Sequence, residues 1–227
     1  MKREHITSQT YIDWLKSLGC VFYAPLDAEN GLNELIQGWT PNINQNMTCV
    51  WDANEQAYLL TGNSSSYAAL MYNGKSLGNS AKIGGSAAFV NYTIIGDFKE
   101  VTRYDTYDTM FGNGGADNYF VNISTGTTRN VLFFACREMA LRNNKTCQLN
   151  AWYNMSQTRN GGQMVYTYFQ NQQIETASSA SWGQTYYQTM DEHVSLGCKS
   201  VCYVKNLYIF NKVLTNDERT IIFNHDH

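Results

Sequence analysis

The chain has few of the features that mark membrane proteins or nucleic-acid-binding proteins. Its 227 residues contain no apolar run of about 18 residues, the length that a membrane-spanning helix needs. Lysine and arginine total 16 against 19 acidic residues, and they form no cluster of the kind that phosphate binding requires. Only two prolines are present, and no low-complexity linker divides the chain. These absences argue against membrane insertion and against a nucleic-acid partner.

A secretory signal is also not visible, which bears on the state of the cysteines. Residues 1–10 carry positive charge but no apolar stretch follows them. An even number of cysteines permits disulfides in an oxidising compartment, but a cysteine thiol also behaves as a small buried hydrophobe. Without a visible signal we favour reduced, buried thiols, and the spacing of the last two cysteines lacks the second pair that a zinc site needs. The six are Cys20, Cys49, Cys136, Cys147, Cys198 and Cys202.

What the chain does have is the composition of a β-protein. Aromatic residues make up 14% of it, including sixteen tyrosines, and such residues pack well on a pleated surface. Short apolar stretches separated by Gly, Asn and Ser clusters predict an all-β sandwich. We expect long loops at 27–56 and 171–192. Strands are predicted at 20–26, 57–61, 67–72, 87–96, 107–112, 119–124, 130–136, 151–158, 163–170, 193–197 and 201–210.

Helical signals occur only near the two ends. From Thr7 or Ser8 to Leu18, apolar residues recur on one face, and Gly19 is a suitable left-handed stop. That stripe either packs against the sandwich or anchors the domain to a larger assembly. Near the other end, Thr215 and Glu218 form the spacing of a capping box, which predicts a short helix that begins there.

Four segments together resemble one family. They are the strand 201–214 that leads into the capping box, the hairpin 148–173, the opening strand 20–27 and the middle strand 107–114. This series is similar to laminin-G-like, concanavalin A-like jelly rolls. The resemblance implies an all-β fold, a two-sheet antiparallel jelly-roll sandwich with a short N-terminal and a short C-terminal helix. It divides the chain into a helical segment, 1–19, and a concanavalin A-like domain, 20–227. Gln172 stands where the family usually has Gly, so we expect another type of turn there.

Catalytic motifs are missing. Glucanases of this superfamily need two carboxylates on one groove, and their pattern Glu-x-Asp-x-x-Glu does not occur. Glu100 and Asp105 do not have the spacing of that pattern. In the cluster 191–193, adjacent side chains of an extended strand would point to opposite faces. No Gly-x-Ser-x-Gly elbow is present. We therefore predict that the protein is not an enzyme.

Two loops carry the aromatic and amide groups that suit sugar recognition, at 113–119 and 181–188. The composition of the first is that of an ordinary hairpin turn, which we favour there, and the alternative for the second is that it covers the rim of the sandwich. Calcium at Asp105, Asp108 and Asp117 is conceivable but not predicted, so we expect no cofactor. The predicted ligand-binding residues are Asp117, Asn118, Tyr119, Trp182, Tyr186 and Tyr187.

The function that follows is non-catalytic recognition of a glycan or a surface protein, at an extracellular surface or on a virion. The first alternative is a structural virion protein, such as a phage head or tail decoration or fibre, in a homo-oligomer or larger assembly. It would explain reduced cysteines without a signal. The second alternative, a glycoside hydrolase, is disfavoured by the missing carboxylate pair.

Overall fold

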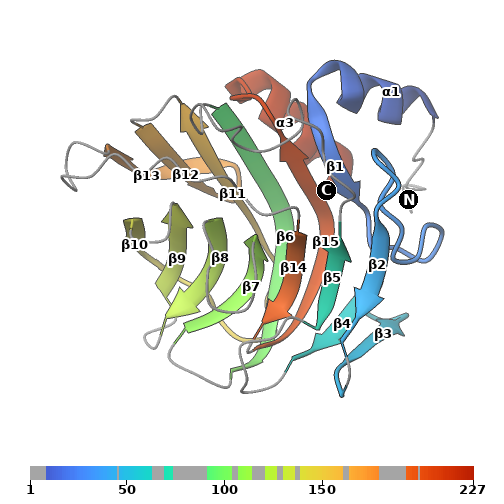
Figure 1. Cartoon of the computed structure of the whole chain (residues 1–227). Helices are drawn as coiled ribbons and strands as arrows, with labels where there is room; N and C mark the ends of the chain where they lie inside the picture. The colour runs from blue at the N-terminus through green and yellow to red at the C-terminus, as the bar shows by residue number, and fades with distance from the viewer. Residues whose placement is uncertain are drawn as a thin grey trace.

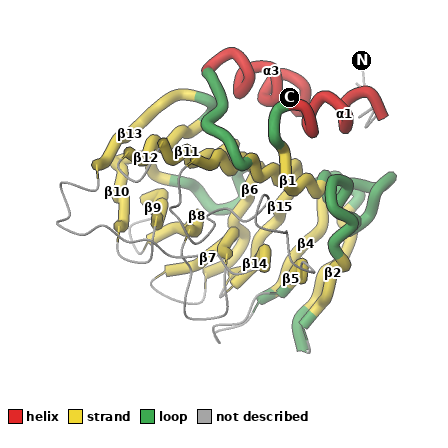
Figure 2. Tube along the Cα trace, turned by 45° about the horizontal axis from the view of Figure 1, so that its top comes forward, coloured by secondary structure: helices red, strands yellow, loops and turns green. Residues whose placement is uncertain are grey.

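Two antiparallel β-sheets face each other, and two helices cover part of the outer face of one of them (Figures 1 and 2). This architecture confirms the predicted all-β sandwich. The computed structural model describes residues 9–44, 46–62, 69–73, 91–103, 107–113, 121–126, 130–135, 139–160, 164–178, 193–198 and 200–227.

The two sheets, A and B, each consist of strands from distant parts of the chain. In spatial order, sheet A contains β13 (Gln172–Ser178), β12 (Met164–Phe169), β11 (Tyr153–Asn160), β6 (Asn91–Arg103), β15 (Ser200–Phe210), β4 (Ala57–Thr61) and β3 (Thr48–Asp52), with β1 (Cys20–Ala24) paired to β15. Sheet B contains, in the same sense, β10 (Met139–Thr146), β9 (Asn130–Ala135), β8 (Val121–Gly126), β7 (Tyr107–Asn113), β14 (His193–Cys198), β5 (Leu70–Asn73) and β2 (Thr40–Ile43). The helices are α1 (Gln9–Ser17) and α3 (Asn216–Asp226).

The four strands that the sequence did not predict are the outermost strands of the two sheets. Strands β3 and β13 end sheet A, while β2 and β10 end sheet B. Edge strands face solvent along one side and carry polar or interrupted sequences, such as Thr-Pro-Asn-Ile in β2. The expected loops 27–56 and 171–192 were therefore wrong where they contain β2, β3 and β13.

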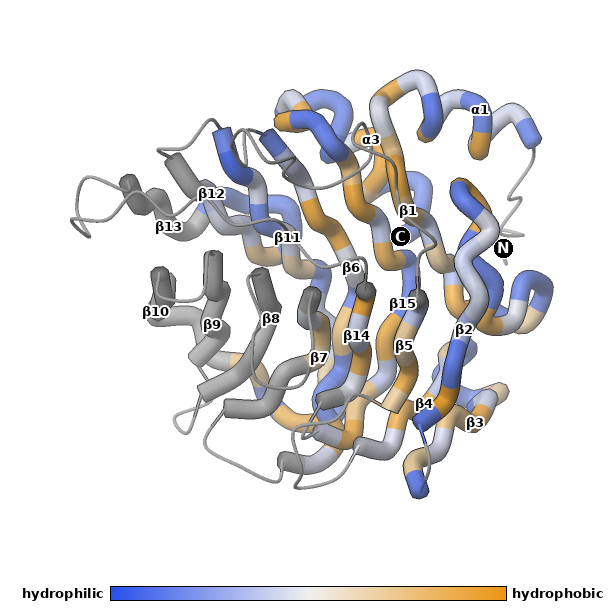
Figure 3. The backbone as a smooth tube through the Cα atoms, viewed as in Figure 1, coloured by the Kyte–Doolittle hydropathy of each residue, from blue (hydrophilic) through white to orange (hydrophobic). Residues whose placement is uncertain are grey.

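Strand β15 is the central element of sheet A because it pairs with three neighbours. One side pairs with β6 along most of its length, and the other pairs first with β4 and then with β1. Asn206 interrupts the ladder to β6 with a positive φ of 52°. An inserted residue reverses the alternation of faces, so Val204 and Leu207 both point into the core. Figure 3 shows the hydrophobic residues along β6 and β15.

A second apolar cluster lies on the outer face of sheet A, under the helices. Ile12 and Leu15 of α1 and Ile222 of α3 are buried there against Tyr23 and Tyr208. The rings of Tyr23 and Tyr208 stack with centroids 4.3 Å apart. The helical stripe predicted near the N-terminus thus packs on the sandwich, which is the first of the two roles proposed for it.

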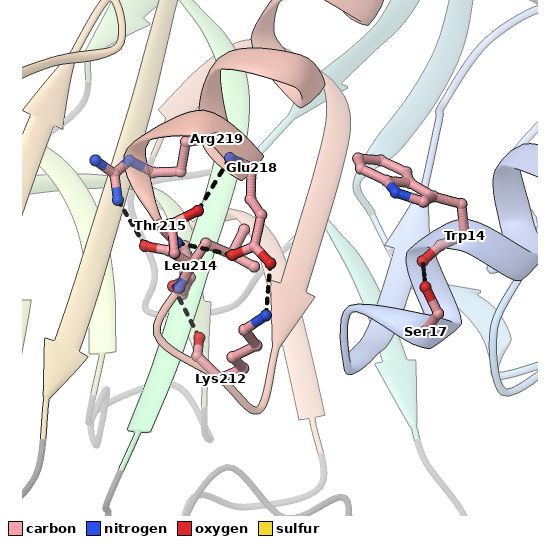
Figure 4. Close-up of polar contacts among 8 residues, drawn as sticks. Trp14, Ser17, Lys212, Leu214, Thr215, Glu218 and Arg219 are labelled. Carbon is pink, nitrogen blue, oxygen red and sulfur yellow. Dashed lines mark hydrogen bonds and ion pairs between the residues drawn. The ribbon is translucent and has the colours of Figure 1, made fainter.

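The helix α3 begins where the capping box predicted. The Thr215 hydroxyl accepts from the Glu218 amide at 3.2 Å, and the Glu218 carboxylate accepts from the Thr215 amide at 2.8 Å (Figure 4). The same carboxylate forms an ion pair with Lys212 at 2.6 Å. Arg219 lies over the ring of Tyr168 on β12 at 3.8 Å, which ties the first turn of α3 to the sheet.

The structure shows the type of the turn between β12 and β13, where Gln172 stands in place of a glycine. Phe169 pairs with Gln172, so the loop contains only Gln170 and Asn171. Both have positive φ, 50° and 56°, as a type I′ turn requires. The side chain of Asn171 also donates to Thr220 of α3 at 3.1 Å.

A buried carboxylate organises the segment after β1. Glu34 is 4% exposed, and its two oxygens accept four backbone amides, those of Tyr23, Ile36, Gln37 and Trp39. Backbone amides that a loop cannot pair within a ladder are satisfied in this way. The Glu34 side chain therefore helps to hold the loop at 27–39 to the sheet.

Four of the six cysteines are present as thiols in the structure: Cys20, Cys49, Cys147 and Cys202. All but Cys49 are buried, as the sequence predicted. Burial raises the pKa of Cys49 to about 12, so the reactive thiolate is disfavoured. Cys198 lies in β14, and Cys136 lies outside the described residues.

The C-terminal end of α3 closes onto a buried polar network at the centre of sheet A. The Asp97 carboxylate accepts from the side-chain amides of Asn154 at 2.8 Å and Asn206 at 2.9 Å. His227 lies 3.3 Å from the same carboxylate. Asp226 accepts from the Tyr208 hydroxyl at 2.9 Å, and burial raises the pKa of its carboxyl group. Helix and sheet are thus joined through charged and amide groups as well as apolar ones.

This contact makes the stability of the fold depend on pH. The hydrogen bond to Asp97 raises the pKa of His227, while partial burial opposes that shift. A raised pKa means that the imidazolium stabilises the folded state below the unfolded pKa of about 6.5, and that this contribution is lost as pH rises through the folded value. We expect the unfolding free energy of the wild type, relative to His227→Gln, to fall between pH values of about 6 and 8. Urea titrations across that range measure it, and parallel curves for the two proteins would contradict the assignment.

Candidate functional site

The six residues predicted to bind ligand all lie outside the described residues, so the structure does not place either loop. Asp105 and Asp117 are outside them as well, and Asp108 lies within β7. Both loops therefore stay predictions. The described residues carry a different surface with the same chemistry, on the outer face of sheet A.

This surface is a row of side chains that crosses five neighbouring strands. Lys99 of β6 pairs with Tyr203 of β15, and Tyr203 pairs with Leu59 of β4. Leu59 in turn pairs with Val50 of β3. Trp152 immediately precedes β11, whose first residue pairs with Phe98, so it continues the row beyond Lys99. We call these five residues the outer-face row.

The row points away from sheet B. Phe98, Val204, Leu60 and Cys49 pack in the core between the sheets, and successive side chains of a strand point to opposite faces. The neighbours of these core residues in the chain therefore point outward. The last contact of α3 falls on Asp97, two residues before Lys99, so the row lies just beyond the end of that helix.

Trp152 is fixed by its polar tip. Its indole N–H donates to the Glu55 carboxylate at 3.0 Å, and the other carboxylate oxygen pairs with the Lys99 ammonium at 2.8 Å. These bonds lower the pKa of Glu55, with the one to Lys99 having the larger effect. A ring held by its donor keeps one orientation, which reduces the entropy lost when a ligand stacks on it.

Tyr203 is held in the same manner. Its hydroxyl donates to Asp52 at 2.7 Å, and this bond lowers the pKa of the Asp52 carboxyl group. Burial, together with the bond to Asp52, raises the pKa of Tyr203 to about 12, so the phenol stays protonated. The rings of Tyr203 and Trp152 lie 6.0 Å apart at an interplanar angle of 46°, and Tyr203 supports Trp152 from the side.

Lys205 supplies the remaining ammonium group. Its Nζ lies 4.4 Å from the ring centroid of Trp152, in a cation–π contact. At a partly exposed site such a contact contributes only about 0.5–1 kcal/mol. The side chain is long and flexible, so the ammonium can leave the ring and donate to a ligand at small cost.

Exposure is lowest in the middle of the row and higher at its two ends. Tyr203 is 8% exposed and Trp152 is partly exposed, while Val50 at the edge is 56% exposed. Among the described residues, the charged groups that contact Trp152 and Tyr203 are two carboxylates, Asp52 and Glu55, and two ammonium groups, Lys99 and Lys205, so these four charges sum to zero. The surface thus combines aromatic, apolar and hydrogen-bonding groups without net charge.

Sequence reasoning missed this surface for a definite reason. Its residues come from the strands β3, β4, β6 and β15 and from the position before β11, and only strand register brings them together. One signal was present, because Trp152 lies at the start of the predicted strand 151–158. The partners Asp52 and Glu55 fell in a segment that was expected to be a loop.

Within the described ranges, no group of three or more His, Cys, Asp or Glu side chains is arranged to hold a metal ion. Neither described helix has the length and apolar character needed to cross a bilayer.

Comparison with known proteins defines the fold. No protein-family model matches the sequence, and no curated protein matches it. Among solved structures, the binding domain of botulinum neurotoxin serotype D is similar with a TM-score of 0.69 at 13% identity, over 92% of this chain and 52% of that one. The binding domain of Paraclostridial Mosquitocidal Protein 1 is similar with a TM-score of 0.65 at 11% identity, over 91% and 52%. Trypanosoma rangeli sialidase is similar with a TM-score of 0.63 at 15% identity, over 92% and 33%.

These likenesses confirm a jelly-roll-like β-sandwich, which is the broad class that the sequence resemblance implied. The chain spans about half the length of the two toxin domains and a third of the sialidase. At such identities the similarity concerns the fold alone.

Proposed function

We propose that this protein is a non-catalytic recognition module that binds glycan on the outer-face row of sheet A. The observation that carries the proposal is the pair Trp152 and Tyr203, each fixed through its polar tip by a carboxylate. Sugar recognition needs an aromatic face for the C–H side of a pyranose and nearby groups that bond its hydroxyls. Lys205, Glu55 and Asp52 are such groups.

The state of the carboxylates supports binding rather than hydrolysis. Glycoside hydrolysis needs one carboxylic acid with a raised pKa beside a second carboxylate. At the row, hydrogen bonds lower the pKa of both Asp52 and Glu55. Asp226, the last residue of α3, does have a raised pKa, but its side chain is only 1% exposed. Two of the similar structures are toxin binding domains, which agrees with a binding role, whereas the sialidase is an enzyme by name.

We also propose that the chain is related to laminin-G-like domains, and that it acts at an extracellular surface or on a virion. A second candidate is the structural role in a larger assembly. The exposed apolar residues Val50 and Ile43, on edge strands of the two sheets, favour it. A stable oligomer in light scattering together with no glycan binding would favour the assembly role over recognition.

A polysaccharide panel tests the function. We expect the protein to bind at least one of immobilised β-glucan, galactan, mannan, xylan, hyaluronan or heparin, and to release no reducing ends from any of them. Binding with reducing-end release would show a hydrolase. No binding to any member, by a protein whose fold is verified by circular dichroism, would overturn the proposal.

A further inference from the structure

We infer that the outer-face row binds an extended, uncharged glycan chain that lies across the strands, rather than a single terminal sugar. This inference rests on the proposed function and specifies its ligand. It follows from the length of the row, from the chemistry of its two ends and from its charge.

The length of the row exceeds one sugar ring. Trp152 lies at the start of β11 and Val50 on β3, so four strand-to-strand steps separate them. At a spacing of about 4.8 Å, these steps span about 19 Å. A monosaccharide covers one ring and touches one end only, whereas a chain laid perpendicular to the strands reaches both.

The two ends of the row differ chemically, so a substitution at one end can show whether a bound glycan reaches it. Trp152 offers an aromatic face next to the Lys205 ammonium. Val50 offers an aliphatic side chain that is 56% exposed, next to Leu59. Between them, Tyr203 is nearly covered and serves as support. A ligand that gains affinity from Val50 must therefore extend past Tyr203.

Charge selects against polyanions. The two ammonium groups, Lys99 and Lys205, are matched in number by the carboxylates of Asp52 and Glu55, and Lys99 is already paired with Glu55 at 2.8 Å. Asp97, two residues from Lys99 on the same face, adds a further carboxylate near Lys205, its register partner. Heparin or hyaluronan would bring negative charge to a surface that holds no excess of positive charge. A neutral chain meets no such repulsion.

The experiment compares oligosaccharides of increasing length. The probes are gluco-, galacto-, manno- and xylo-oligosaccharides from disaccharide to hexasaccharide, with a heparin hexasaccharide as the polyanion, measured by titration calorimetry on the full chain. We expect affinity in one neutral series to rise by at least about tenfold from disaccharide to hexasaccharide, and the heparin fragment to bind more weakly than that hexasaccharide.

Two variants locate the chain on the row. Val50→Asp should weaken the hexasaccharide several-fold and leave the disaccharide unchanged, because only the longer chain reaches β3. Ile43→Asp is the matched control, since Ile43 is 44% exposed on β2, an edge strand of the other sheet. It should change neither affinity.

The outcomes separate this inference from the proposed function. Equal affinity for disaccharide and hexasaccharide, or an unaltered hexasaccharide affinity in Val50→Asp, would overturn the extended chain while glycan binding stands. Tighter binding of the heparin fragment would overturn the neutral ligand. Loss of binding to every glycan would instead remove the proposed function itself.

Discussion

Replacing Trp152 by alanine is expected to lower the affinity for every glycan that the protein binds by at least about tenfold. The indole is the largest partly exposed aromatic surface of the outer-face row, and its N–H bond to Glu55 fixes its orientation. Truncation removes the stacking surface and also leaves Lys205 without its ring contact. Titration calorimetry with the best-binding oligosaccharide measures the loss.

Two controls accompany this substitution. Trp152→Phe keeps an aromatic face without the donor and should retain part of the affinity. Ile221→Ala removes an exposed apolar side chain, 53% exposed, from the helix α3 and should have no effect. Equal affinities for wild type and Trp152→Ala, with the fold retained in both, would remove the outer-face row as the glycan site.

Replacing Asp97 by asparagine is expected to cost about 3 kcal/mol of unfolding free energy. Asp97 is 1% exposed and accepts from two side-chain amides, and asparagine would turn one acceptor oxygen into a donor that faces another donor. It would also remove the charge that pairs with His227. Urea unfolding followed by circular dichroism should show a lower midpoint with an unchanged slope.

The control for this variant is the same change at an exposed position. Asp13 accepts from Gln9 at 2.7 Å on the surface of α1, and Asp13→Asn should stay within about 0.5 kcal/mol of the wild type. If Asp97→Asn were as stable as Asp13→Asn, the buried network would not hold α3 to the sheet.

The parts of the fold that could be predicted are those with local signals. The capping box at Thr215 and Glu218 fixed the start of α3, because both hydrogen bonds are made within four residues. The central strands, such as β15 and β6, carry apolar residues that packing between two layers requires. Edge strands such as β3 lack that signal because one of their sides meets solvent.

The candidate site could not be predicted because its geometry is set by register. The pairing of Lys99 with Tyr203 depends on a ladder between β6 and β15 that contains an irregularity at Asn206. A shift of one residue would turn Tyr203 into the core and Val204 outward. The loops at 113–119 and 181–188 were chosen for composition alone, and they remain the competing location for a ligand.

The most direct test is to find where a bound glycan protects the protein. Carbene footprinting of the full chain, with and without the best-binding oligosaccharide, reports protection residue by residue. The account predicts reduced labelling of Trp152, Lys205 and Val50, with Ile43 and Ile221 unchanged. Protection confined to the loops at 113–119 and 181–188, with Trp152 labelled equally in both states, would contradict it.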